Sequence, residues 1–67
     1  MDITSREATK IALDAALDGG YKGATVTATY HNDDENMFEV ELEDESGTQI
    51  SVAVDGGSGI VVELTTD

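Results

Sequence analysis

Hydrophobic and polar residues alternate along three short runs in the second half of the chain. The apolar positions of these runs are Phe38, Val40 and Leu42, then Ile50, Val52 and Val54, then Ile60, Val62 and Leu64. A period of two residues is typical of strands that bury one face. Glycine-bearing segments at 44–47 and 55–59 separate the runs and predict tight turns. This part of the chain therefore predicts a three-stranded β-meander.

The first third of the chain has the period of a helix instead. Thr4 and Glu7 have the spacing of a capping box, in which each side chain accepts a hydrogen bond from the other residue's main-chain amide. An apolar arc follows at helical spacing. It consists of Ala8, Ile11, Ala12, Leu13, Ala15 and Ala16. Because Gly19 and Gly20 tolerate the left-handed backbone of a helix end, we predict a helix that begins at Thr4 and ends near Asp18.

A fourth strand is predicted between the helix and the meander. Val26, Ala28 and Tyr30 alternate with Thr25, Thr27 and Thr29, and we expect the first set to face the core. The polar residues 31–36 then form a turn. Together these elements predict a single α+β domain over residues 1–67, with one N-terminal helix packed on a four-stranded antiparallel β-meander.

The length of the chain limits the kind of site it can build. A domain of roughly 60 residues buries only about 60% of the surface of its unfolded chain, which leaves little room for a large cavity. No apolar run approaches the roughly 20 residues that span a bilayer, and no basic-then-apolar secretion signal begins the chain. We expect a soluble protein without membrane insertion, cytoplasmic as the sequence stands, or extracellular or envelope-associated if an export signal has been removed.

The charge of the chain is strongly one-sided. It has 15 acidic and 3 basic residues, for a formal net charge of −12. Arg6, Lys10 and Lys22 all lie in the first third, and the residues after Lys22 include 11 acidic side chains but no lysine or arginine. Such a charge disfavours direct contact with nucleic acid or anionic lipid. It favours a protein partner with a basic surface.

The candidate partner-binding residues are the acidic side chains of the second half. Glu39, Glu41 and Glu43 alternate with apolar residues, so they should stand about 6.8 Å apart in a row on the sheet face opposite the helix. The full candidate set is Asp33, Asp34, Glu35, Glu39, Glu41, Glu43, Asp44, Glu45 and Glu63.

Nothing in the sequence has the spacing of an active site, and we predict no enzyme activity, cofactor or metal. His31 is the only histidine and is expected to be a solvated turn residue, since zinc takes about four N, S or O ligands. The acidic run 33–35 lacks the central glycine of an EF-hand loop. The glycine-rich segment 56–59 precedes a strand and has no lysine, unlike a phosphate-binding loop.

Motifs spread over most of the chain resemble the PepSY domain family. They are A-x-x-I-A-L at 8–13, the aromatic-E-V-E strand at 38–41, the turn glycine Gly47, and V-x-V-D-x-x-x-G-x-V at 52–61. Gly56 and Gly57 differ from the turn residues usual in that family. The resemblance implies a non-catalytic protein-binding or inhibitory module, of the kind found in metallopeptidase propeptides and envelope-associated proteins, that modulates a peptidase.

Two other interpretations of the acidity stay open. Regularly spaced carboxylates can imitate duplex DNA and occupy the basic groove of a nucleic-acid-binding protein, as in acidic phage-type inhibitors. Alternatively, an acidic surface with little lysine is the composition of a halophilic protein, in which salt screens the self-repulsion.

Overall fold

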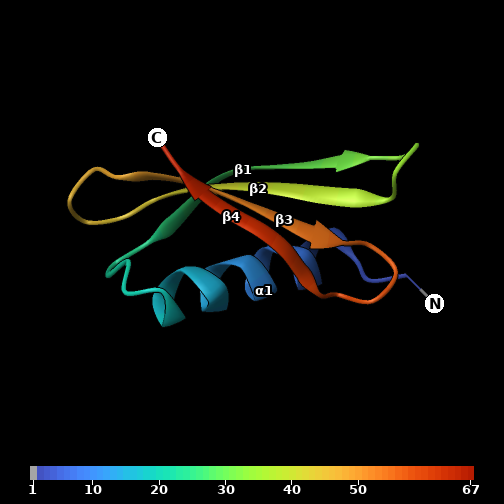
Figure 1. The fold of residues 1–67 in the computed structure, drawn as a ribbon, viewed down its shortest axis with the longest axis horizontal. Helices are drawn as coiled ribbons and strands as arrows, with labels where there is room; N and C mark the ends of the chain where they lie inside the picture. Colours follow the sequence, from blue (N-terminus) through green and yellow to red (C-terminus); the bar gives the residue numbers. More distant parts are fainter. Residues whose placement is uncertain (1) are drawn as a thin grey trace.

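The computed structural model describes residues 2–67, so that only Met1 lies outside it. It consists of α1 (Ser5–Asp18), β1 (Thr25–Asn32), β2 (Met37–Glu43), β3 (Gln49–Asp55) and β4 (Val61–Thr66), as Figure 1 shows. The four strands form one antiparallel sheet in the order β1-β2-β3-β4, and α1 packs on one of its faces. The predicted α+β fold is confirmed. The other face of the sheet is left uncovered, and β1 and β4 are its edges.

Local hydrogen bonds set both ends of α1. Thr4 Oγ1 accepts from the Glu7 amide over 3.1 Å, and Glu7 Oε1 accepts from the Thr4 amide over 2.8 Å, which confirms the capping box. At the other end Gly20 has a φ of 91°, a left-handed conformation that favours glycine. No helix among residues 2–67 is both long and apolar enough to cross a membrane.

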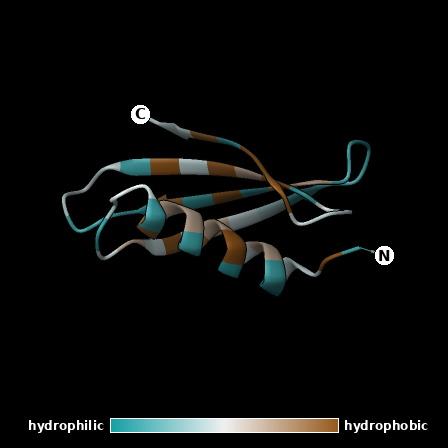
Figure 2. Ribbon diagram, turned by 60° about the horizontal axis from the view of Figure 1, so that its bottom comes forward, coloured by the Kyte–Doolittle hydropathy of each residue, from teal (hydrophilic) through white to brown (hydrophobic). Residues whose placement is uncertain are grey.

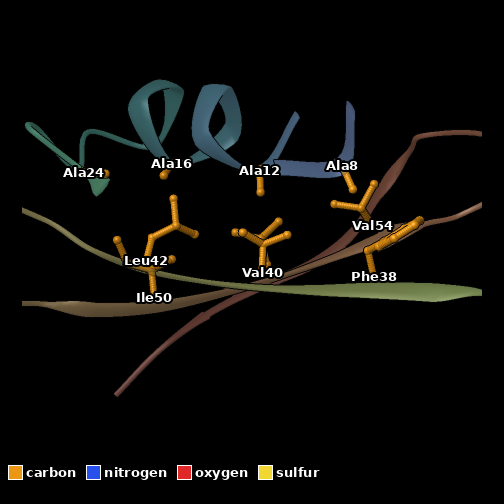
Figure 3. Close-up of a cluster of buried hydrophobic side chains, with 10 residues drawn as sticks. Ala8, Ala12, Ala16, Ala24, Phe38, Val40, Leu42, Ile50 and Val54 are labelled. Carbon is orange, nitrogen blue, oxygen red and sulfur yellow. The ribbon is translucent and has the colours of Figure 1, made fainter. Parts of the chain in front are cut away.

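Three fully buried alanines bring the helix close to the sheet. Ala8, Ala12 and Ala16 have no exposed surface and point toward the side chains of β2 and β3 (Figure 3). The buried residues that they meet in this core cluster are Phe38, Val40, Leu42, Ile50, Val52 and Val54. The alternation of apolar residues along β2 and β3 is confirmed. The glutamates between the apolar residues of β2 therefore stand on the uncovered face.

The predicted faces of β1 are wrong beyond its third residue. Val26 pairs with Leu42 but Ala28 pairs with Glu41, so Thr27 is an extra residue in a β-bulge. A one-residue insertion moves every later side chain to the other face. Tyr30 therefore lies on the uncovered face instead of in the core.

The side chain of Thr29 shows the same inversion from the other side of the sheet. Its Oγ1 lies 3.0 Å from Oγ1 of Thr9 on α1, so this threonine faces the helix. The sequence pattern had placed it on the polar face.

A second bulge changes the face that β4 presents. Val61 pairs with Val54 and Glu63 pairs with Ala53, so Val62 is the extra residue. Val61 and Leu64 pack against the core, whereas Val62 is 60% exposed and Ile60, which precedes the strand, is 65% exposed. The prediction that Ile60 and Val62 face the core is wrong. Glu63 keeps its predicted place on the uncovered face.

The carboxylate of Asp55 organises the turn between β3 and β4. Its Oδ1 accepts from the main-chain amides of Ser58 over 3.1 Å and Gly57 over 2.7 Å. These bonds favour the charged carboxylate and lower the pKa of Asp55 below its ordinary value of 3.8.

Asp55→Asn should therefore lower the melting temperature at pH 7. A depressed pKa adds stability that is fully present above the pKa of the unfolded chain and is lost as the pH falls through the pKa of the folded state. The difference between the variant and the wild type should narrow as the pH is lowered from 7 through about 4. Thermal unfolding of both proteins across this range tests the prediction. A difference that does not change with pH would contradict it.

Candidate protein-binding face

Cross-strand rows organise the uncovered face of the sheet. Directly opposite residues of antiparallel strands point to the same side, so the pairing gives each row. The rows are Tyr30, Glu39, Ala53 and Glu63; then Ala28, Glu41, Ser51 and Thr65; then Thr25, Glu43 and Gln49. We call Glu39, Glu41, Glu43 and Glu63 the acidic face.

Glu39 and Glu43 are exposed on this face, and Glu41 is half-buried between two small neighbours, Ala28 and Ser51. Ala28, Ser51 and Ala53 are all shorter than glutamate and lie beside β2. Glu41 also accepts a hydrogen bond from the Ser51 hydroxyl, which ties its carboxylate to β3. The strand geometry places successive β2 glutamates about 6.8 Å apart. The prediction that Glu39, Glu41 and Glu43 form a row on the sheet face opposite the helix is confirmed.

The remaining candidate residues lie at the two ends of the sheet. Residues 33–35 form the hairpin between β1 and β2, and Asp44 and Glu45 lie in the hairpin between β2 and β3. Asp44 Oδ1 accepts from the amides of Ser46 and Thr48 over 2.9 and 2.8 Å, so its carboxylate builds the turn. The nine predicted residues thus divide into one face and two separate hairpins.

His31 is part of the β1–β2 hairpin and packs against the core. Its ring stacks on Phe38 with the ring centroids 4.4 Å apart. Nδ1 lies 3.0 Å from Asp33 Oδ1, and Nε2 lies 2.9 Å from Asn36 Oδ1. His31 is exposed, as predicted, but it lies in β1 and not in the turn. Its ring is held by Phe38, Asp33 and Asn36.

Tyr30 is the residue of this face that the sequence pattern missed. It is 61% exposed and pairs with Glu39 across β1 and β2. Exposed aromatic side chains are over-represented among the residues that dominate binding energy at protein interfaces. Only the bulge at Thr27 brings Tyr30 to this side, and no residue type in β1 signals that bulge.

The two layers of the molecule differ in charge. Two basic residues, Arg6 and Lys10, lie on α1 among three acidic ones, whereas the sheet and its hairpins carry no lysine or arginine. The negative potential is therefore concentrated on the sheet side.

The described part of the chain, residues 2–67, contains no pocket and no group of three or more acidic or histidine side chains placed to hold a metal ion. No known protein family, curated protein or solved structure matches this chain. The surfaces on which a partner could bind are the acidic face and the two sheet edges beside it, β1 and β4.

Replacing Glu39, Glu41 and Glu43 by glutamine should raise the free energy of unfolding at low salt. Two like charges about 6.8 Å apart repel by about 0.6 kcal/mol in water, and the variant removes two such neighbouring pairs. The melting temperature of the wild type should rise with added salt, and that of the variant should rise less.

The control for this stability measurement is Asp33→Asn/Asp34→Asn/Glu35→Gln, which removes the same number of charges from a hairpin. Thermal unfolding in low salt and in about 0.5 M salt compares the three proteins. Identical salt dependence in the wild type and the β2 variant would show that the glutamates of β2 do not repel one another measurably.

Proposed function

We propose that this protein is a non-catalytic protein-binding module whose acidic face binds a basic surface of a partner protein. The single observation that carries the proposal is the row of carboxylates on a sheet face that no element of the described chain covers. A uniformly charged row steers an oppositely charged partner and selects for charge complementarity.

The distribution of charge favours binding over general solvation. Solvation alone gives no reason for the charge of the two layers to differ. Here α1 has nearly balanced charges, while the sheet has only acidic ones. Tyr30 adds an exposed aromatic side chain beside Glu39, which is a combination suited to an interface.

The resemblance to PepSY domains supports a peptidase as the partner. The segment 52–61, the most specific part of that resemblance, forms most of β3, its following turn and the first residue of β4. In this role the module inhibits or modulates the peptidase by occupying a basic surface on it.

The spacing of the acidic row favours a second candidate, the imitation of DNA. Successive β2 glutamates repeat at about 6.8 Å, which is twice the 3.4 Å axial rise of phosphates along one strand of B-DNA. In this role the module occupies the basic groove of a nucleic-acid-binding protein.

Affinity capture over a salt gradient tests the proposal and separates the two candidates. Immobilised wild-type protein should retain a basic partner at low salt and release it as salt rises, and mass spectrometry then identifies the partner as a peptidase or a nucleic-acid-binding protein. Duplex DNA added as a competitor should displace a nucleic-acid-binding partner but not a peptidase. A partner that resists about 0.5 M salt would contradict binding through the acidic face.

A further inference from the structure

One row of main-chain groups along β4 has no partner within residues 2–67. The Asp67 amide donates to Gln49 O over 3.1 Å at the end of this strand pair. Residues of an antiparallel pair bond to the neighbouring strand at every second position. The amide and carbonyl groups of Leu64 and Thr66 therefore point away from the sheet, as in any exposed edge strand.

The side chains along this edge are partly apolar and partly acidic. Val62 and Ile60 are 60% and 65% exposed, and Leu64 is half-buried against the core. Glu63, between Val62 and Leu64 in the sequence, lies on the acidic face. Figure 2 shows the first part of β4, at the edge of the sheet, as hydrophobic. The edge therefore offers hydrogen bonds, apolar surface and negative charge together.

We propose that β4 accepts an extended segment of the partner as a fifth strand of the sheet. This inference rests on the proposed function, because it names the part of the basic partner that binds. Strand addition supplies main-chain hydrogen bonds for affinity, and alternate side chains supply specificity.

The register of β4 specifies the chemistry of the added segment. Its residue opposite Glu63 joins the row that already holds Glu39 and Glu63, so a lysine or arginine fits there. Its residue opposite Leu64 lies on the helix side of the sheet, next to apolar side chains, so an apolar residue fits there. The segment that fits is an extended one in which basic and apolar residues alternate.

Charge argues against a second copy of this chain in the same position. Pairing two β4 edges would bring two chains of net charge −12 together, with Glu63 and Asp67 of each at the contact. A bulge interrupts each edge, at Thr27 in β1 and at Val62 in β4. The β1 edge is less suited because it has no exposed aliphatic pair like Ile60 and Val62.

Amide hydrogen exchange in the presence of a short synthetic peptide of alternating lysine and valine tests the inference. The amides of Leu64 and Thr66 should exchange about tenfold more slowly at a peptide concentration about ten times its Kd, because strand addition gives them acceptors. A peptide of the same composition with the lysines in one block should bind more weakly and protect neither amide. Absence of protection with the alternating peptide would overturn the inference.

Two surface variants give an independent test. Val62→Lys places a positive charge at the edge and should weaken binding of the alternating peptide about tenfold. Leu17→Lys, at a 49% exposed position on α1, makes the same change away from the edge and should leave binding nearly unchanged. Equal effects of both variants, or concentration-dependent dimers that protect the same amides without peptide, would contradict the proposed occupant.

The outcomes for the edge and for the acidic face are distinguishable. Peptide binding that is weakened by Glu39/Glu41/Glu43→Gln but leaves Leu64 and Thr66 unprotected would refute the edge and support the face. Protection of both amides that is unaffected by the glutamine variant would support the edge and contradict the proposed function.

Discussion

Replacing Gly56 by alanine should cost about 3 kcal/mol or more of unfolding free energy. Gly56 is buried, and a Cβ added there would lie 2.7 Å from the main-chain oxygen of Asn36 and also overlap its side-chain amide. Rotation of the Asn36 side chain cannot relieve the clash, because the main-chain oxygen accepts the Gly56 amide over 2.7 Å. Gly56 O also accepts from the Ile3 amide over 2.8 Å.

The expected loss is large for a domain of this size. At about 0.05–0.15 kcal/mol per residue, a chain of 67 residues has a total stability of about 3–10 kcal/mol. Gly57→Ala is the matched control, because a Cβ there meets only the Asp55 carboxylate, at 3.3 Å. Urea unfolding of both variants should show a much lower midpoint for Gly56→Ala and a midpoint near that of the wild type for Gly57→Ala. Similar midpoints for the two would contradict the packing of this turn.

The elements of the fold follow from short-range signals in the sequence. The capping box at Thr4 and the glycines after Asp18 delimit α1, and the strict alternation of β2 determines which of its side chains are buried. These signals depend on neighbours a few residues away, so they can be read without the tertiary structure.

The two bulges could not be predicted from the same signals. Thr27 and Val62 are residue types that favour regular strands, and each becomes an insertion only through its pairing with the next strand. The need for glycine at position 56 could not be predicted either, because it arises from close contact with Asn36 of a different hairpin. The turn was predictable, but this packing requirement was not.

The candidate site was predicted in part for the same reason. Alternation along β2 places Glu39, Glu41 and Glu43 correctly, whereas Tyr30 joins the face only because of the bulge in β1. Counting acidic residues along the chain also grouped the two hairpins with the face, although Asp44 uses its carboxylate in a turn.

Replacing Glu39, Glu41 and Glu43 by glutamine should weaken binding of the basic partner about 10- to 100-fold. A contacted charge pair at an exposed surface contributes up to about 1 kcal/mol, and each 1.4 kcal/mol is a tenfold change in Kd. The affinity of the variant should also depend much less on salt than that of the wild type, because fewer charges take part in binding. Titration of the captured partner at two salt concentrations measures both effects.

The hairpin variant Asp33→Asn/Asp34→Asn/Glu35→Gln is the control for net charge. It removes as many carboxylates as the face variant but leaves the acidic face intact. Its affinity should stay within a few-fold of the wild type, since long-range attraction alone changes little at physiological salt.

The most direct measurement is the capture of partner proteins from a cell lysate on three immobilised proteins. These are the wild type, the face variant Glu39/Glu41/Glu43→Gln and the hairpin variant. Quantitative mass spectrometry compares the amount of each protein retained. The acidic face predicts a basic partner that the wild type and the hairpin variant retain and the face variant loses. Equal loss by both variants would mean that net charge alone attracts the partner, and equal retention by all three would mean that the partner binds elsewhere.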